Sequence, residues 1–388
     1  MRQMLHGLLC GAALLLPACQ DPVDVDTGQE APPEGCMPIP EARDDGWAVG
    51  APGAHGLDED ALCALVDELR AGDIPMVDSL HVIRGGVLVV DEVFRTEITE
   101  YDFGLNTDLE VHTLQSATKS VVNALIGVGV RRGELGGVDD RLLAYFPEYG
   151  ALENPDPRKD AWTIEDFLTM QSGLDWDEWG APWGDPDNDL WTTYVSASDY
   201  TRALLDHPLV NDPGTGFTYC TICSYALGKL VQNAADVPLA DYADAQLFDP
   251  LGITTDLWVL TPERIPNMGG GLLLSGRDMA RFGQLYLQDG VWDGERLLPE
   301  GWVAETITEH VSFDGPLGSL GRGYGYHWWL EDLDDGGIYA AQGYGGQVIY
   351  VWPAQDAVIV FTGRNWDDYE RHVPSEVMAG GLMAAFVE

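Results

Sequence analysis

Ser116 and Lys119 stand three residues apart, as Ser-Ala-Thr-Lys, at the head of a long apolar stretch. Residues 121–130 are almost entirely aliphatic, which predicts a buried helix that carries both side chains on one face. A serine at a helix start faces unpaired backbone N–H groups, and these suit an oxyanion. Partial desolvation lowers the pKa of such a lysine and makes a neutral amine base accessible. The spacing therefore predicts a nucleophile and its base, and a capping serine beside a lysine that reaches water is the alternative.

Two further stretches carry groups that such a pair needs. Tyr219 precedes a predicted helix, and a phenol near a lysine can pass a proton between nucleophile and leaving group. Gly343 and Gly345 flank Tyr344 between two predicted strands, where glycines let backbone N–H groups approach a reacting carbonyl. A core tyrosine and a glycine-rich bulge are the alternative interpretations.

The sequence lacks the motifs that other common catalytic mechanisms require. The eight histidines form no H-E-x-x-H motif, and the chain has no G-x-S-x-G elbow, no P-loop lysine motif and no Rossmann glycine fingerprint. The acidic run 185–189 is typical of a calcium loop, but the sixth position is not glycine and Ser196 stands where the closing glutamate should be. We therefore predict no metal and no cofactor.

The net charge of the chain limits the kinds of molecule that it can bind. The 388 residues carry a formal net charge of −44 at pH 7, with acids along the whole chain. Such a surface repels phosphate backbones and anionic lipid head groups, which excludes nucleic-acid partners. A small-molecule substrate remains, and the length allows one large domain or two.

The first residues are predicted to be a targeting segment. Arg2 precedes an apolar run over 5–16 that is too short to span a membrane. Residues 1–19 end on Pro-Ala-Cys, which resembles a bacterial lipoprotein signal and predicts lipidation of Cys19; secretion with cleavage nearby is the alternative. Residues 20–45, acidic and rich in Pro and Gly, predict a flexible tether before a domain over 46–388. We expect an exported envelope protein that faces the periplasm or the exterior and meets the membrane only through its lipid anchor.

Four cysteines would remain in the exported chain besides Cys19. An even number in an oxidising compartment predicts disulfides, and of the three pairings we favour Cys36 with Cys63 and Cys220 with Cys223. A C-x-x-C redox site is the alternative for the second pair, although no thioredoxin-like pattern surrounds it.

Strands are predicted near both chain ends, with helices between them. A helix at 57–71 that Asp58 would cap precedes β-rich runs at 79–84 and 87–94, and Gly85-Gly86 joins these runs as a hairpin signal. Further strands are predicted at 324–330, 338–342, 347–352 and 357–362, and helices at 163–170, 199–206, 225–234, 239–249, 276–287 and 374–386. This order predicts an α+β fold, with an antiparallel sheet from the two chain ends and a mainly helical insertion over about 133–266.

The predicted loop 172–198 is long for a compact domain, and such loops tend to be functional. Trp176 and Trp179 are predicted to contact the substrate, and Trp183 and Trp191 could extend the same aromatic wall. Glu178 in this loop, and His327 among the later strands, are interpreted as structural residues.

Together, the three motif stretches, in this order around a helical middle, resemble the serine β-lactamase and penicillin-binding-protein superfamily. The resemblance is to its class C and esterase branch, which includes nylon-oligomer (aminohexanoate-dimer) hydrolases. Supporting phrases lie at 164–174, 249–253, 277–283 and 324–329. The resemblance implies a β-lactamase-like fold, Ser116 as the acylated nucleophile, Lys119 as its base and Tyr219 as the acid/base partner. It also implies an oxyanion hole from the backbone N–H groups of Ser116 and of a residue near Tyr344, with Gly343 and Gly345 beside the substrate. The register of the third motif leaves Tyr344 or a neighbour up to Gln347 as the second donor.

The chain departs from this pattern in two places. The second motif is usually Y-x-N or S-x-N, whereas Thr221 stands at the third position here. The third motif usually begins with a cation that pairs with a substrate carboxylate, but Ala341 and Gln342 precede the glycine. We therefore expect a serine hydrolase for an ester or amide without an essential carboxylate. A D,D-peptidase or β-lactamase is the alternative enzyme, and a catalytically silent envelope binding protein on the same fold is the alternative of another class.

Overall fold

The computed structural model describes residues 37–99, 103–105, 108–254, 256–313, 321–331, 337–366 and 372–387. The predicted signal segment 1–19, the lipidation site Cys19, Cys36 and most of the predicted tether lie outside the described residues. Within the described residues, no helix has both the length and the apolar character that crossing a membrane requires.

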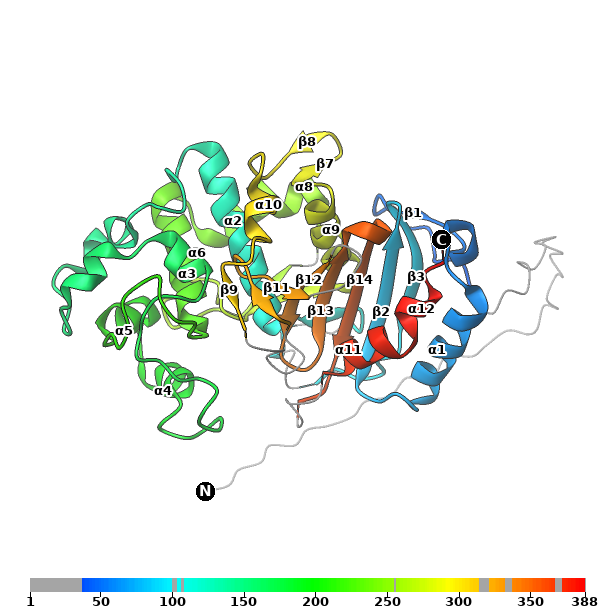
Figure 1. The fold of residues 1–388 in the computed structure, drawn as a ribbon, viewed down its shortest axis with the longest axis horizontal. Coiled ribbons are helices and arrows are strands. Elements are labelled where there is room, and N and C mark those ends of the chain that lie inside the picture. Colours follow the sequence, from blue (N-terminus) through cyan, green and yellow to red (C-terminus); the bar gives the residue numbers. More distant parts are fainter. Residues whose placement is uncertain are drawn as a thin grey trace, which may run out of the picture. The chain divides into compact units, whose positions relative to one another are not determined.

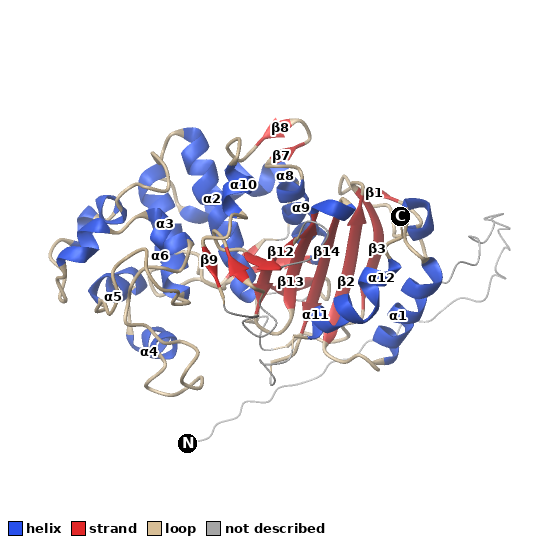
Figure 2. Cartoon of the chain, in the orientation of Figure 1, coloured by secondary structure: helices blue, strands red, loops and turns tan. Residues whose placement is uncertain are grey.

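A nine-stranded sheet, drawn in red in Figure 2, forms the centre of the domain. Its central pair joins a strand from each end of the chain in antiparallel register, with Phe361 opposite Leu80. This confirms the predicted fold class. In sheet order the strands are β1 (Ala48–Val49), β3 (Val87–Val93), β2 (Val77–Arg84), β14 (Ala357–Gly363), β13 (Gln347–Trp352), β12 (Ile338–Gly343), β11 (Trp329–Glu331), β10 (Gly323–Tyr324) and β9 (Val311–Ser312). Only β1 joins its neighbour in parallel, at the outer edge.

Backbone conformation explains where two of these strands begin and end. Gly85 and Gly86 both have positive φ, 58° and 73°, as a tight hairpin turn requires, and the predicted hairpin is confirmed. The predicted strand at 324–330 is wrong, because His327 has a φ of 58° and splits it into β10 and β11. The backbone N–H of His327 donates to Leu168 O, and its carbonyl accepts from the Ser120 hydroxyl, so tertiary hydrogen bonds hold the break.

Helices from the two chain ends cover one face of the sheet (Figure 1). The predicted helix α1 (Glu59–Ala71) begins at its cap Asp58, whose side chain accepts from Ala61 N. The last helical stretch is continuous but changes type, as α11 (Val373–Val377), the π-helix η9 (Met378–Leu382) and α12 (Met383–Ala385). Apolar side chains of these helices pack on alternate residues of β2, β13 and β14 to form one of the two cores.

The opposite face of the sheet packs on α9 (Gly276–Leu287), a helix predicted with the same bounds. Gly283 lets α9 approach closely, because a Cβ there would lie 2.6 Å from a methyl group of Val358 and 2.8 Å from one of Ile349. The larger core lies on this side and continues into the helical part of the domain.

The helical part contains α2 (Thr118–Arg132) packed against α6 (Thr221–Ala235). Its other elements are η4 (Leu142–Tyr145), η5 (Pro147–Tyr149), η6 (Pro157–Ala161), α3 (Ile164–Leu168), α4 (Asp189–Ser196), α5 (Tyr200–Asp206), α7 (Leu239–Ala243), η7 (Asp244–Phe248) and α8 (Asp249–Leu251). A small sheet of β4 (Val111–Thr113), β6 (Leu272–Ser275) and β5 (Leu257–Trp258) borders it, and β7 (Val291–Trp292), β8 (Glu295–Arg296) and α10 (Trp302–Thr306) follow α9.

Two boundaries in this part differ from the prediction. The predicted loop 172–198 contains α4, which Asn188 caps by accepting from Trp191 N. This capping accounts for one polar residue of the acidic run. The helix predicted to begin at residue 225 begins four residues earlier, where the Cys220 sulfur accepts from Cys223 N. The predicted Cys220–Cys223 disulfide is confirmed, and Cys63 is also disulfide-bonded.

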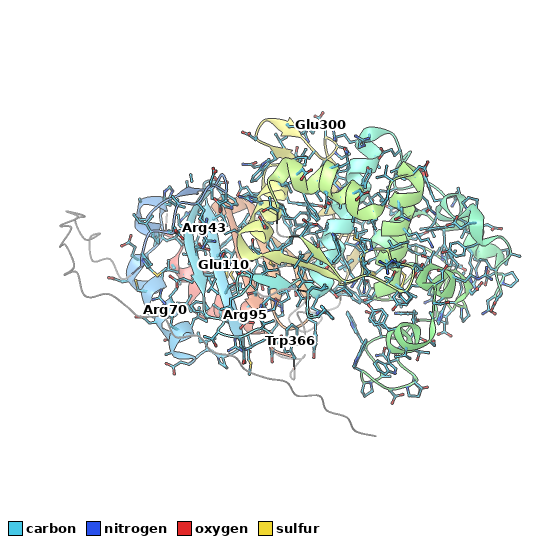
Figure 3. The ribbon with its side chains drawn as sticks, turned by 180° about the vertical axis from the view of Figure 1, so that it is seen from behind. Arg43, Arg70, Arg95, Glu110, Glu300 and Trp366 are labelled. Carbon is cyan, nitrogen blue, oxygen red and sulfur yellow. A yellow bond between two sulfur atoms is a disulfide. The ribbon has the colours of Figure 1, made fainter. Side chains whose placement is uncertain are left out.

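The folded domain begins before the predicted boundary at residue 46. Met37 is buried in the core under α1, and Arg277 donates to the carbonyl of Glu41 and to the carboxylate of Asp45. Arg43 and Glu110, which lie next to each other in Figure 3, form a bidentate ion pair. Residues 37–45 are therefore part of the domain rather than of a flexible tether.

Candidate active site

Ser116 lies in a single 3-10 turn, η3 (Gln115–Ala117), immediately before α2. Gln115 has a φ of 47°, and its backbone N–H and its side-chain amide both donate to the Thr113 hydroxyl at the end of β4. A non-glycine residue in the left-handed region costs about 1–3 kcal/mol and persists only where its surroundings hold it. This bend places Ser116, which is half-buried, at the start of the helix.

Lys119 lies one turn further along and is 1% exposed. Its Nζ is 2.9 Å from Ser116 Oγ, 3.0 Å from Thr221 Oγ1 and 2.6 Å from the carbonyl oxygen of Gly269. Glycine is needed at 269, because a Cβ there would lie 2.5 Å from the Thr221 methyl group. Burial lowers the pKa of Lys119 to about 8, and the charge of Glu178 opposes that shift. The amine is thus in contact with Ser116 and easy to deprotonate.

The Tyr219 hydroxyl lies near the Ser116 side chain, and this interaction opposes the rise in the pKa of Tyr219. The centroid of its ring lies 4.9 Å from Lys119 Nζ, 4.6 Å from the ring centroid of Trp179 and 6.0 Å from that of Trp329, and both tryptophan rings are stacked with it. Burial raises the pKa of Tyr219 well above its usual value, so the phenol is neutral and can carry a proton. The structure therefore brings the side chains of Ser116, Lys119 and Tyr219 together at one place.

The segment after β12 lies against the turn that carries Ser116. A Cβ on Gly343 would be 2.1 Å from the carbonyl oxygen of Leu114 and 3.2 Å from the backbone nitrogen of Ala117. Tyr344 follows directly, and its hydroxyl donates to the carbonyl of Trp366, which Figure 3 labels near the lower edge of the domain. Gly345 has a φ of 84°, and its α-carbon faces the ring of Trp366. The roles of Tyr344 and the two glycines in an oxyanion hole stay predictions.

Gly343→Ala is expected to destabilise the domain by about 3 kcal/mol, because the added methyl group meets two backbone atoms that cannot move independently. It should also slow any reaction of Ser116 by pushing η3 away from β12. Urea unfolding gives the stability, and the rate of covalent labelling of Ser116 gives the second effect. Gly380→Ala is the matched control, since nothing lies within 4 Å of a Cβ there. Equal behaviour of the two variants would show that this contact does not position the nucleophile.

The predicted tryptophans do not share one environment. Trp179 is 49% exposed and covers Tyr219. Trp176 is 7% exposed, and its indole N–H donates to Glu178. Its contact with the substrate stays a prediction. Trp183 and Trp191 contact each other edge to face, 5.2 Å apart.

Two polar residues at this site had no functional assignment from the sequence. Glu178 was interpreted as structural, yet its carboxylate binds both the backbone N–H and the hydroxyl of Thr221, which in turn contacts Lys119. The sequence did carry a signal for Thr221, since it occupies the third position of the second motif. No local signal distinguishes Glu178 from the neighbouring acids.

The His327 side chain is buried and contacts two helices, α2 and α6. Its Nδ1 is 3.0 Å from the carbonyl of Lys119 in α2, and its Nε2 is 3.1 Å from the Ser224 hydroxyl in α6. Burial lowers its pKa to about 3, so the ring is neutral. These contacts support the structural role expected from the sequence.

Family comparison agrees with this geometry. The sequence model of the beta-lactamase family matches residues 64–372, which include Ser116, Lys119 and Tyr219. The chain belongs to the beta-lactamase family. It is 25% identical over 306 residues to the 6-aminohexanoate-dimer hydrolase of Paenarthrobacter ureafaciens, a match that covers 75% of this chain and 73% of the relative.

Two further comparisons give a protein of similar fold and a relative of similar sequence. A penicillin-binding protein from Bacillus halodurans shares the fold, with a TM-score of 0.61 and 19% identity over 80% of this chain and 99% of that one. A lovastatin esterase of Penicillium rubens is 28% identical over 163 residues, which are 37% of this chain and 39% of the esterase. The protein is therefore a beta-lactamase-family hydrolase, whose relatives include an aminohexanoate-dimer hydrolase and an esterase.

Proposed function

We propose that the protein cleaves esters or amides through an acyl-enzyme on Ser116. Neutral Lys119 removes the hydroxyl proton as Ser116 Oγ attacks the substrate carbonyl carbon. The resulting oxyanion accepts hydrogen bonds from the backbone N–H groups of Ser116 and Tyr344. Tyr219 passes the proton to the leaving alcohol or amine, and the carbon–heteroatom bond breaks. Water then attacks the acyl group, gives its proton to the same group of residues and releases the acid.

One observation carries this proposal. Ser116 Oγ lies 2.9 Å from the Nζ of a lysine that is 1% exposed. A surface lysine would be protonated at neutral pH, whereas burial brings the pKa of Lys119 to about 8. At pH 7 roughly a tenth of the protein then has a neutral amine in contact with the nucleophile.

The surroundings favour a neutral substrate. Ala341 and Gln342 stand where a cation would bind a substrate carboxylate, and the chain carries a net charge of −44. Trp179 and Trp329 stack with Tyr219 and place aromatic surface at the site, which suits an uncharged, partly apolar group. The names of the aminohexanoate-dimer hydrolase and the lovastatin esterase agree with an amide or ester bond as the target.

Treatment with a fluorophosphonate is expected to add one phosphonyl group, and peptide mapping should place it on Ser116. The labelling rate should rise about tenfold per pH unit below pH 8 and level off above it, because only neutral Lys119 accepts the serine proton. Intact mass measured against time at several pH values gives both results. A folded protein without an adduct would overturn the hydrolase proposal. A stable benzylpenicillin adduct would instead overturn the neutral-substrate proposal and favour a D,D-peptidase or β-lactamase.

A further inference from the structure

Glu178 is a partly buried carboxylate in the segment that precedes α4, next to the site but out of direct hydrogen-bond contact with Lys119 or Ser116. One carboxylate oxygen, Oε2, accepts from Thr221 N at 2.7 Å and from Trp176 Nε1 at 2.8 Å. The other, Oε1, accepts from the Thr221 hydroxyl at 2.7 Å. Three donors thus converge on one side chain. Burial raises the pKa of Glu178, but the charge of Lys119 and these three hydrogen bonds favour the ionised carboxylate.

These contacts fix the direction of the next hydrogen bond. A carboxylate can only accept, so the hydroxyl proton of Thr221 must point to Glu178. The lone pairs of Thr221 Oγ1 then face Lys119, whose Nζ donates to it at 3.0 Å. Thr221 is 5% exposed, so its hydroxyl group has little access to water as an alternative hydrogen-bond partner.

The second acceptor of Lys119 is equally fixed. The carbonyl oxygen of Gly269, 2.6 Å from Nζ, can only accept. A neutral amine has two N–H groups and one lone pair. When Thr221 and Gly269 take the two N–H groups, the lone pair is left for the hydroxyl proton of Ser116, 2.9 Å away.

We infer that Glu178 is a positioning residue that acts through Thr221 to aim the lone pair of Lys119 at Ser116. This inference rests on the proposed function, because it concerns the proton transfer that begins acylation. The negative charge of Glu178 has a second effect, since it favours the protonated form of Lys119 and so sets the pH range of the reaction.

Glu178→Gln keeps the shape of the side chain but replaces one acceptor oxygen with an NH₂ donor, so the hydrogen bond to the Thr221 hydroxyl reverses its direction. The amide oxygen satisfies two donors if it replaces Oε2, which leaves the amide NH₂ to donate to Thr221 Oγ1. The Thr221 hydroxyl must then direct its proton elsewhere, and the lone pair of Lys119 is the nearest acceptor. This competes with Ser116 for the base.

Fluorophosphonate labelling of the full chain, followed by intact mass from pH 5 to 10, tests the inference. Glu178→Gln should slow labelling about 30-fold on the pH plateau, because proton transfer to a positioned base contributes about 10²–10⁴-fold. The midpoint of its pH profile should also fall by about one unit, because a nearby negative charge is lost. Thr221→Val should slow labelling about tenfold, and Thr221→Ser, which keeps the hydroxyl, should stay within about threefold of the native protein.

Glu263→Gln is the matched control, since Glu263 also accepts a backbone N–H, from Tyr200, and lies 3.3 Å from a lysine, Lys229, outside this site. It should leave the labelling rate and midpoint unchanged. If the native protein labels and Glu178→Gln labels with the same rate and midpoint, the positioning role is overturned while the proposed function stands. If rates fall but the midpoint stays and Thr221→Ser fails to restore labelling, Glu178 is merely structural. No labelling of the native protein would contradict the proposed function itself.

Discussion

Ser116→Ala is expected to lower kcat/KM for a neutral ester by about 10⁴-fold or more, because it removes the oxygen that forms the acyl bond in the proposed mechanism. The domain should remain folded. Ser116 is half-buried, and its side chain contacts Lys119 and Tyr219 without filling the core. The loss of free energy of unfolding should therefore be about 1 kcal/mol or less, as at other sites outside the core. Ester hydrolysis and thermal unfolding measure the two quantities.

Ser120→Ala provides the control on the same helix. Ser120 is 1% exposed, and its hydroxyl donates to the carbonyl of His327 at 2.7 Å, so its removal should cost stability, about 1–2 kcal/mol. It should keep hydrolysis within about threefold of the native rate, since it donates to none of the reacting groups. An active Ser116→Ala variant would exclude the acyl-enzyme, and an inactive Ser120→Ala variant would show that helix packing rather than the nucleophile is being tested.

Sequence patterns predict those parts of the fold that depend on local backbone geometry. Asp58 caps α1 as predicted, two glycines with positive φ make the β2–β3 hairpin, and α9 keeps its predicted bounds. Ser116 and Lys119 belong to this class, because a spacing of three residues on a helix fixes their proximity whatever the rest of the chain does. Their predicted proximity did not depend on the tertiary structure.

The features that the sequence patterns did not predict depend on contacts between residues far apart in the chain. Glu178 and Thr221 are 43 residues apart in sequence, and nothing local shows that a threonine hydroxyl in the second motif would bind that carboxylate. The inward orientation of Trp176 depends on the same carboxylate. The break at His327 likewise follows from hydrogen bonds of its backbone to Leu168 and to Ser120, which periodicity within 324–330 does not contain. Tyr219 is an intermediate case. The order of the three motifs along the chain identified it as a site residue, although its distance in sequence from Ser116 could not.

Lys119→Ala is expected to reduce hydrolysis nearly as much as Ser116→Ala, about 10³–10⁴-fold, because without the amine the Ser116 proton has no base in contact. Ser116 and Lys119 act as one unit, so the double variant should be no slower than Ser116→Ala alone. Additive losses would mean that Lys119 acts in some other step, such as substrate binding. The comparison needs kcat/KM for the two single variants and the double variant with one ester.

Chemical rescue separates loss of the base from loss of packing. Lys119→Ala leaves an empty, buried space between Thr221 Oγ1 and the Gly269 carbonyl, both of which formerly accepted from Nζ. A small primary amine such as propylamine can occupy that space, so it should restore hydrolysis by about tenfold or more, with a pH dependence that follows the pKa of the added amine. Lys119→Met fills the same space with an apolar chain and should show no rescue. Rescue of both variants, or of neither, would mean that the amine of Lys119 is not the base that deprotonates Ser116.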